Sequence, residues 1–415
     1  MRVMIIVTSL NGGGVERAAS KLASKLSEHH EVWVVCTWPQ GNENGTYSIS
    51  PDVKILNLDQ PYPFRKQHGK VLTYLGKCRQ RHQLISYWKR LYRIEVAISF
   101  HTQCNMDNVL GRGWDHPVIS VRNIMQVPGS KHWFWKFMDS VQCIWAGALA
   151  DEVICVSDSV AREQRRKFLV APRKLHTVYN SVEAGAIWRE AEKPVEHAAF
   201  RSLRARSGFM IITAGRYVEQ KGHLHLLKVF RRLSERFPDL SLVILGEGML
   251  RQEYESYLRK HGLQDRVLLP GFVKEPFRWF GEADLFVMPS IYEGFSNALL
   301  EAEACGLPIV AADCVSGARE LLAPGTEITK HTDRVEYAEY GILTAPLSGF
   351  PERTNWERGE EALRAAILRM IRDRKLREFY RERSFQRCAD FSPEKNYREW
   401  EEIVTKYEEG AKHAE

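Results

Sequence analysis

The stretch EGFSNALLEAEACG begins at Glu293 and carries a second acid at Glu301. It follows ADLFVMPS, an apolar run that predicts a buried strand, so Glu293 falls in a loop and the next residues begin a helix. Free N–H groups at a helix start bind anions, and carboxylates accept hydrogen bonds from hydroxyl groups. An ordinary helix with a favourable acid near its N-terminus is the competing interpretation.

Two cations occur in GRYVEQKG, where Arg216 ends one predicted strand and Lys221 precedes a helix. The arginine fork and the lysine point charge suit a diphosphate, although two ordinary surface cations in a loop explain the pattern equally well. The next two strands end in LGEG and LPGF. Glycines at these strand ends allow close backbone approach to a ligand, and backbone groups there could pair with the edge of a nucleobase. Plain turn chemistry explains the same residues without a ligand. The candidate residues are Gly246, Gly248, Phe272 and Val273.

The elements that position these residues alternate between strand and helix, which predicts an α/β fold with mostly parallel sheets. The pattern runs through residues 1–182, fades over the charged, alanine-rich stretch 182–207, and restarts over 207–390. We therefore expect two doubly wound domains joined by a linker, with a cleft between them where ligands meet the strand ends. A last helix, at about 392–411, has one apolar face and is expected to cross back onto the first domain.

The first domain has its own candidate residues at strand ends. NGGGVERAA follows the first strand, and its Gly13 and Gly14 allow close backbone approach to a ligand, although a simple turn explains them too. His101 ends the strand EVAISFH, either as a ligand contact or as a structural histidine. Arg122 and Asn123 end the next strand and suit an anionic acceptor, whereas an ion pair between the domains is the alternative.

Taken in order, GRYVEQKG, LGEG, LPGF and PSIYEGFSNALLEAEACGLPIVAAD resemble the family-4 retaining glycosyltransferases, which have the GT-B fold of two Rossmann-like domains facing a cleft. The resemblance covers nearly the whole chain. It implies a nucleotide-sugar donor, with Glu293 on the donor sugar, Glu301 on the ribose, and Arg216 and Lys221 neutralising the leaving diphosphate. His101 would contact the donor sugar. The sugar and diphosphate would also meet backbone N–H groups of Gly294, Phe295, Ser296 and Asn297.

The sequence contains no D-x-D motif, which many glycosyltransferases of the other common fold use to hold a divalent metal. In this chain Arg216, Lys221 and the helix start can supply the positive charge instead. We therefore expect no cofactor and no metal requirement. Glu303 stands where the family often has an apolar residue, and we assign it no role.

EGFSNALLEA followed by DCVSGARELL is similar to bacterial members that extend lipid-linked glycans. The resemblance implies a UDP-linked hexose or N-acetylhexosamine as donor, although no residue distinguishes uridine from guanosine or adenosine, and a membrane-associated acceptor. The segment 64–93 is basic and has an apolar face at helical spacing, with Lys89 on that face and expected to snorkel towards water. KHWFWKF at 131–137 suits a headgroup zone. These features predict a peripheral enzyme on an anionic membrane, although a domain helix with a basic outer face explains the first equally well.

Bulk properties fit this expectation. The formal net charge of +7 suits anionic partners, and eight scattered cysteines without a C-x-x-C pair indicate a reducing, cytoplasmic compartment. Two other enzyme classes remain as alternatives: a nucleotide-sugar epimerase of the same fold, and a dinucleotide-binding oxidoreductase, although the first turn reads NGGGVE rather than G-x-G-x-x-G. Nucleic-acid binding would rest on charge alone and is not expected.

Overall fold

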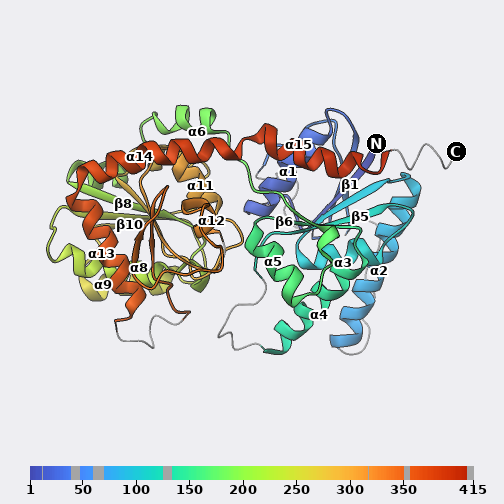
Figure 1. The fold of residues 1–415 in the computed structure, drawn as a ribbon, viewed down its shortest axis with the longest axis horizontal. Coiled ribbons are helices and arrows are strands. Elements are labelled where there is room, and N and C mark those ends of the chain that lie inside the picture. The colour runs from blue at the N-terminus through green and yellow to red at the C-terminus, as the bar shows by residue number, and fades with distance from the viewer. Residues whose placement is uncertain are drawn as a thin grey trace. The chain divides into compact units, whose positions relative to one another are not determined.

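The computed structural model describes residues 1–11, 13–38, 47–58, 70–124, 133–315, 317–349 and 356–408 (Figure 1). The chain divides into two compact units. Unit 1 comprises residues 1–126, 130–180 and 394–415, and unit 2 comprises residues 127–129 and 181–393.

Unit 1 is built on a parallel sheet whose described strands lie in the order β3-β2-β1-β4-β5-β6-β7. The strand order reverses between β1 and β4, and a crevice at the carboxyl ends of such a strand pair is where ligands bind in doubly wound sheets. The strands are β1 (Arg2–Val7), β2 (Glu31–Cys36), β3 (Lys54–Asn57), β4 (Val96–Phe100), β5 (His116–Val121), β6 (Glu152–Cys155) and β7 (Leu175–Thr177).

Helices cover both faces of this sheet because its central strands are apolar on both sides. The last of them comes from the end of the chain: Trp400, Ile403 and Val404 join the core that contains Val3 and Ile5. The expected return of the C-terminal helix to the first domain is therefore confirmed. The helices are α1 (Gly14–Leu26), α2 (Lys70–Leu91), α3 (Thr102–Leu110), α4 (Trp133–Leu149), α5 (Asp158–Lys167), η2 (Pro172–Lys174) and α15 (Pro393–Thr405).

Unit 2 repeats this architecture, with its described strands in the order β10-β9-β8-β11-β12-β14-β13. Only the β13–β14 pair is antiparallel among these strands, and the order reverses between β8 and β11. The strands are β8 (Phe209–Ala214), β9 (Leu240–Leu245), β10 (Val267–Gly271), β11 (Leu285–Met288), β12 (Ile309–Ala312), β13 (Val335–Tyr337) and β14 (Ile342–Thr344).

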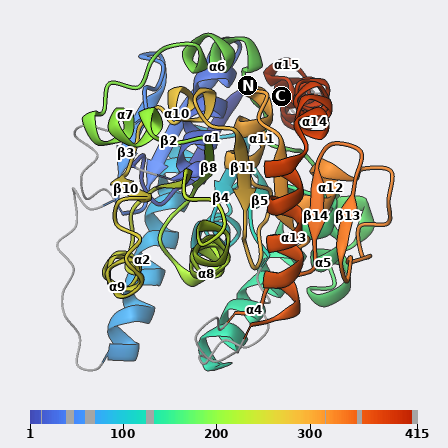
Figure 2. The ribbon, with the colours of Figure 1, turned by 90° about the vertical axis from the view of Figure 1, so that its left-hand side faces the viewer.

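The helices of unit 2 include α8 and α13, which lie side by side in Figure 2 and are joined by buried side chains described below. In chain order the helices are α6 (Ala184–Ala191), α7 (Ala198–Ala205), η3 (Glu219–Lys221), α8 (His223–Ser234), α9 (Arg251–His261), α10 (Phe277–Gly281), α11 (Asn297–Ala304), α12 (Ala318–Leu322), α13 (Arg358–Arg372), α14 (Arg374–Cys388) and η4 (Ala389–Phe391).

The stretch that the sequence predicts as a linker, 182–207, instead contains α6 and α7, which belong to unit 2. Phe200 is fully buried and its ring lies 4.6 Å from that of Trp279. Gly281 packs against the end of α6, because a Cβ there would come within 2.0 Å of the Ala191 carbonyl oxygen. Each of these two helices has only two buried residues, so its apolar face is too short to stand out in the sequence among charged neighbours.

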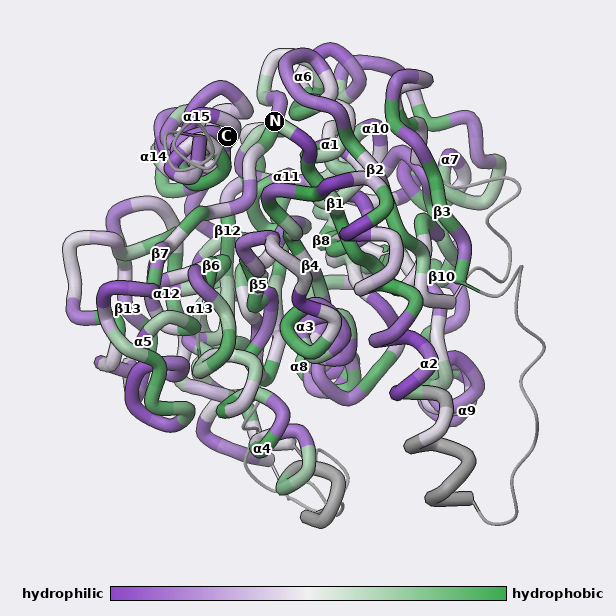
Figure 3. The backbone as a smooth tube through the Cα atoms, turned by 90° about the vertical axis from the view of Figure 1, so that its right-hand side faces the viewer, coloured by the Kyte–Doolittle hydropathy of each residue, from purple (hydrophilic) through white to green (hydrophobic). Residues whose placement is uncertain are grey.

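The basic segment 64–93 is predicted to lie on a membrane or to form a domain helix with a basic outer face. Most of its described part belongs to α2, which is mostly purple in Figure 3 and packs within unit 1. Ile85 and Trp88 of α2 pack on the sheet of unit 1, and Lys89 is buried rather than snorkelling. Its Nζ donates to Asp115 Oδ2 at 2.8 Å and to Asn108 Oδ1 at 2.6 Å. The ion pair with the buried Asp115 offsets the cost of burying the charge of Lys89. The side chains of residues 71, 74, 75 and 131–136 lie outside the described residues.

Candidate functional site

The centre of the candidate site in unit 2 is an ion pair between Lys221 and Glu293. Lys221 Nζ lies 2.5 Å from Glu293 Oε1, and Ser290 Oγ donates to the same oxygen at 2.8 Å. Glu293 is only 6% exposed, and the Lys221 side chain is 18% exposed. These residues follow β8 and β11, the strand pair where the order reverses. The structure thus brings together two residues that the sequence assigned separately to diphosphate and sugar, at the crevice position expected of a ligand site.

The loops that hold this pair are themselves locked together. Ile291 N donates to Gln220 O at 2.8 Å, and Gln220 Nε2 donates to Tyr292 O at 3.0 Å. Gly222 adopts φ 63°, and a Cβ at this position would come within 1.9 Å of the Pro289 carbonyl oxygen. Only glycine therefore allows the lysine loop to press against the loop that carries Glu293.

Helix α11 starts directly beside the acid. Ser296 is its N-cap, and its side chain accepts from Leu299 N at 3.4 Å. Gly294 and Phe295 are buried, whereas Asn297 and Glu301 are partly exposed. Glu301 lies one turn further along the helix. The structure thus has the predicted arrangement: Glu293 lies in the loop, small residues stand at the helix start, and Glu301 follows within the helix.

A buried network after β12 supports the Glu293 loop from behind. Asp313 accepts from Arg319 through two oxygens, at 3.2 and 2.5 Å, and Arg319 also reaches Glu336 at 2.8 Å. Although burial opposes it, hydrogen bonds from His331 and Arg319 hold the pKa of Asp313 below its usual value. The loop that this network fixes contains Val315, whose carbonyl oxygen accepts from Glu293 N at 3.4 Å.

The remaining predicted residues of unit 2 differ in exposure. Arg216 and Phe272 are exposed, and Phe272 keeps 61% of its accessible surface, while Val273 is partly buried. Gly246 has a packing role of its own, because a Cβ would come within 2.0 Å of the Gly215 carbonyl oxygen. A Cβ on Gly248 would lie 2.6 Å from the Tyr217 carbonyl oxygen. The glycines of LGEG are therefore required by the turn itself, whatever binds beside it.

Unit 1 has a second polar pair, at the carboxyl ends of β1 and β4. His101 directly follows β4 and is the N-cap residue of α3, with φ 75°, a left-handed conformation that costs a non-glycine residue about 1–3 kcal/mol. Its Nε2 lies 3.1 Å from Oε1 of Glu16 in the first turn of α1. Glu16 was not among the predicted site residues. Gly13 is the N-cap of α1, and Gly14 is its exposed first residue.

The predicted acceptor residues of unit 1 have partners of their own. Arg122 donates to Asn180 Oδ1 and lies 5.7 Å from the ring centre of Phe100, so its observed partners are within unit 1. Burial lowers the pKa of Arg122 to about 10. Asn123 Oδ1 accepts from the N–H of Ile124 at 2.9 Å, which fixes the local turn.

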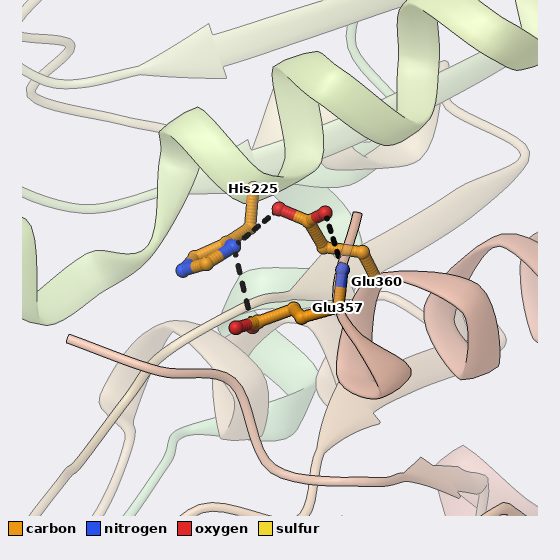
Figure 4. Close-up of side chains that lie close together, drawn as sticks. All are labelled: His225, Glu357 and Glu360. Atoms are coloured by element: carbon orange, nitrogen blue, oxygen red, sulfur yellow. Dashed lines mark hydrogen bonds and ion pairs between the residues drawn. The ribbon is translucent and has the colours of Figure 1, made fainter. Parts of the chain in front are cut away.

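Among the residues that the structure describes, His225, Glu357 and Glu360 form a group with metal-ligand chemistry (Figure 4). His225 Nδ1 lies 2.8 Å from Glu360 Oε1, and its Nε2 lies 2.9 Å from the Ser348 carbonyl oxygen. Both ring nitrogens of His225 therefore already face oxygen acceptors rather than an open coordination position. Lys228 Nζ also lies 2.5 Å from Glu360 Oε1. The group is better described as an ion-pair cluster that joins α8 to the capping box of α13.

Hydrogen bonds within this cluster also act on the carboxyl of Glu360. Burial alone would raise its pKa, but the contacts with His225 and Lys228 hold it below the usual value. Glu360 is thus already in contact with Lys228 and His225, and a divalent cation would have to displace these contacts.

Comparison with known proteins agrees with the geometry of both units. Residues 12–185 match the family model for Glycosyltransferase Family 4, and residues 196–341 match the model for Glycosyl transferases group 1. An uncharacterized glycosyltransferase of Methanocaldococcus jannaschii is 31% identical over 92% of this chain and 94% of its own length. The chain belongs to glycosyltransferase family 4. As a member of this family, it is a glycosyltransferase with the GT-B fold.

Further relatives of this glycosyltransferase show the same coverage. It is 27% identical to the N-acetylgalactosamine-N,N'-diacetylbacillosaminyl-diphospho-undecaprenol 4-alpha-N-acetylgalactosaminyltransferase of Campylobacter jejuni, over 93% of this chain and 94% of that one. Among solved structures, sucrose-phosphate synthase of Thermosynechococcus elongatus has a TM-score of 0.75 at 17% identity, covering 98% and 99% of the two chains. HepE of Anabaena in complex with UDP and glucose has a TM-score of 0.72 at 16% identity, covering 97% and 99%. These structural matches concern the fold.

Three supporting features escaped sequence reasoning. Ser290 lies just before the acidic loop in MPSIYEG, and its hydroxyl gave no periodic signal. Asp313 and Arg319 are six residues apart across a turn, so their pairing depends on how the loop folds. Glu16 had a usable signal, since it is an acid in the first turn of the helix that follows a glycine-rich loop.

Proposed function

We propose that this glycosyltransferase moves a hexose or N-acetylhexosamine, with retention of configuration, from a UDP-sugar to a glycan acceptor on a lipid carrier. The Lys221–Glu293 pair at the start of α11 carries the proposal. A nucleotide-sugar offers one partner to each residue of this pair. The sugar hydroxyls can donate to the carboxylate of Glu293, and the diphosphate can bind the ammonium group of Lys221. Arg216 and the helix start add positive charge where the leaving diphosphate becomes more negative.

Charge supplied in this way does not need a divalent cation, which supports metal-independent transfer. The donor's nucleotide and the acceptor are proposed from relatives: HepE is described in complex with UDP and glucose, and the Campylobacter enzyme is named for a diphospho-undecaprenol acceptor. Glu301 is proposed to bind the ribose hydroxyls, and His101 to contact the transferred sugar. Arg122 and Asn123 remain candidates for the acceptor.

A lipid-linked acceptor brings the protein to the inner face of a membrane, and we propose that it binds there peripherally. Helix α4 offers a row of exposed apolar side chains at helical spacing, namely Phe137, Ile144, Trp145 and Leu149. Exposed basic residues lie on the neighbouring helix, at Arg165, Arg166 and Lys167. Apolar groups flanked by cations suit an anionic bilayer surface. Over the described part of the chain, no helix is long and apolar enough to span a bilayer.

Thermal shift with UDP, GDP and ADP is the first test, followed by transfer assays with the sugars of the stabilising nucleotide. We expect UDP to stabilise the protein and the other two to do so less. Glu293→Gln should reduce transfer at least about 100-fold while changing the Kd for UDP by less than about threefold, since removing one transition-state contact typically costs this much. Glu301→Gln is the matched control and should weaken UDP binding instead. Loss of UDP binding in the Glu293 variant would contradict the assignment.

Flotation with vesicles tests the membrane proposal separately. The protein should float with vesicles of phosphatidylglycerol and phosphatidylcholine, and less with phosphatidylcholine alone. Trp145→Ser should reduce flotation, whereas Phe379→Ser, at an exposed aromatic residue of unit 2, should not. Equal flotation with both kinds of vesicle would contradict the role of anionic lipid.

A further inference from the structure

The contact between Glu16 and His101 joins two strand ends at the place where the strand order of unit 1 reverses. Glu16 lies in the first turn of α1, which follows β1, and His101 directly follows β4. The carboxylate oxygen and the ring Nε2 are 3.1 Å apart. Neither side chain is fully buried, so the pair is in contact with solvent on one side.

Several neighbours show that the carboxylate of Glu16 has a built position. Thr8 Oγ1 donates to the same oxygen at 3.4 Å. A Cβ on Gly13 would come within 2.1 Å of Glu16 Oε2, so the glycine leaves the space that this carboxylate occupies. Although burial opposes it, the contact with His101 holds the pKa of Glu16 below its usual value. The carboxylate is therefore ionised and fixed at neutral pH.

We infer that Glu16 is a positioning residue that orients His101 towards the donor sugar. An ionised carboxylate only accepts hydrogen bonds, so Nε2 of His101 must carry the proton that is shared with it. In the neutral imidazole Nδ1 is then left with a lone pair, and Nδ1 has no hydrogen-bond partner among the residues that the structure describes. His101 thus offers an acceptor for a sugar hydroxyl, and a sugar that lacks this hydroxyl should be a poorer substrate. This inference rests on the proposed contact of His101 with the transferred sugar.

The inference predicts that the two residues act as one unit in catalysis. Glu16→Met removes the acceptor at similar size and should lower kcat/KM about 10-fold, since a misplaced contact group loses most of its effect. Glu16→Gln keeps an acceptor oxygen and should recover part of this loss. His101→Ala should lower kcat/KM further, and adding Glu16→Met to it should change the value by less than about twofold, because coupled residues are not additive. Independent, multiplying losses would overturn the inference, as would a Glu16→Met variant with wild-type kinetics.

The protonated nitrogen of His101 can be measured without any substrate. In protein labelled with 15N-histidine, at pH 9, we expect the Nε2–H tautomer in the wild type and a mixture of tautomers after Glu16→Met. The matched control is Glu401→Gln, which removes the carboxylate 2.8 Å from His30 Nε2 in the same unit and should leave both the His101 signal and kcat/KM unchanged. An Nδ1–H tautomer in the wild type would overturn the inference.

The two levels of the proposal fail in different ways. If the wild type transfers no sugar from any nucleotide donor, the proposed function is wrong and the role of Glu16 in it is lost as well. If the wild type transfers sugar but Glu16 and His101 contribute independently, only the positioning role is refuted.

Discussion

A buried acid without a partner, Glu303 on α11, offers the sharpest test of the physical reasoning. Its side chain is 0% exposed, and neither carboxyl oxygen has a hydrogen-bond partner among the described residues. Burial raises its pKa well above the usual value, and the positive charge of Arg387 offsets this only in part. We expect Glu303→Met to stabilise unit 2, because methionine fills a similar volume and has no polar group to desolvate.

The size of the effect follows from two terms. Replacing an unsatisfied buried polar group recovers about 1–3 kcal/mol. The second term depends on pH: the folded pKa of Glu303 lies above the unfolded value, so the wild type keeps its full stability below the unfolded pKa and loses stability as pH rises towards the folded pKa. The gap between wild type and variant should therefore widen by up to about 1.4 kcal/mol per pH unit within this window. Glu303→Gln keeps the polar group but cannot ionise, so it isolates this second term.

Calorimetry at pH 5, 6.5 and 8 on the wild type and the two variants measures both terms. For a unit of this size, each kcal/mol shifts the melting temperature by about 2–4 °C. Glu382→Gln is the matched control, since Glu382 is exposed on the neighbouring α14, and it should give no pH-dependent difference. A Glu303→Met variant that is less stable than the wild type at pH 8 would refute a desolvation cost at this site, as would a gap between Glu303→Gln and the wild type that narrows as pH rises.

Three further predictions concern the loops and charges of unit 2. Gly222→Ala should destabilise the protein by more than about 2 kcal/mol, because its Cβ would meet the Pro289 carbonyl oxygen at 1.9 Å. The control Gly262→Ala has the same φ of 63° and nothing within 4 Å of its Cβ, so it should cost only about 1 kcal/mol. Unfolding in urea compares the two variants, and equal losses of stability would contradict a steric cause. Lys221→Met leaves Glu293 without its cation and should weaken UDP binding at least about 10-fold by calorimetric titration, since a charge-assisted contact is worth about 1.5–3 kcal/mol. Transfer should keep its rate in excess EDTA, and loss of activity that manganese restores would show a metal requirement.

Much of the fold could be predicted from the sequence because its signals are local. Buried parallel strands appear as short apolar runs, and each one here ends in residues that allow a tight turn or bind polar groups. The motifs at these ends, taken in order, resemble the family closely enough to assign Glu293 and Lys221 to one donor site, and the structure adds that both follow the strand pair β8 and β11. The ion pair between them, however, depends on the approach of two loops, which only Gly222 and Pro289 in their folded positions make possible.

The errors have a common physical origin in tertiary partners. Lys89 looked out of place on an apolar helix face, because its partner Asp115 lies far along the chain and only the fold brings the two together. The helices α6 and α7 were hidden because each contributes only a few buried residues to unit 2. The position of Glu16 beside His101 was likewise invisible, since the two residues belong to different strand–helix units.

The return of α15 to unit 1 has a consequence for how the protein is made. Unit 2 is continuous in sequence from position 181 to 393, so a ribosome delivers all of it before the last helix of unit 1 emerges. Until then the sheet of unit 1 lacks Trp400, whose ring lies 6.0 Å from that of Phe100. We therefore expect the nascent N-terminal half to remain a chaperone client during synthesis. A fragment ending at residue 180 should be aggregation-prone, and a co-expressed segment 390–415 should improve its solubility; a soluble, cooperatively folding fragment would contradict this view.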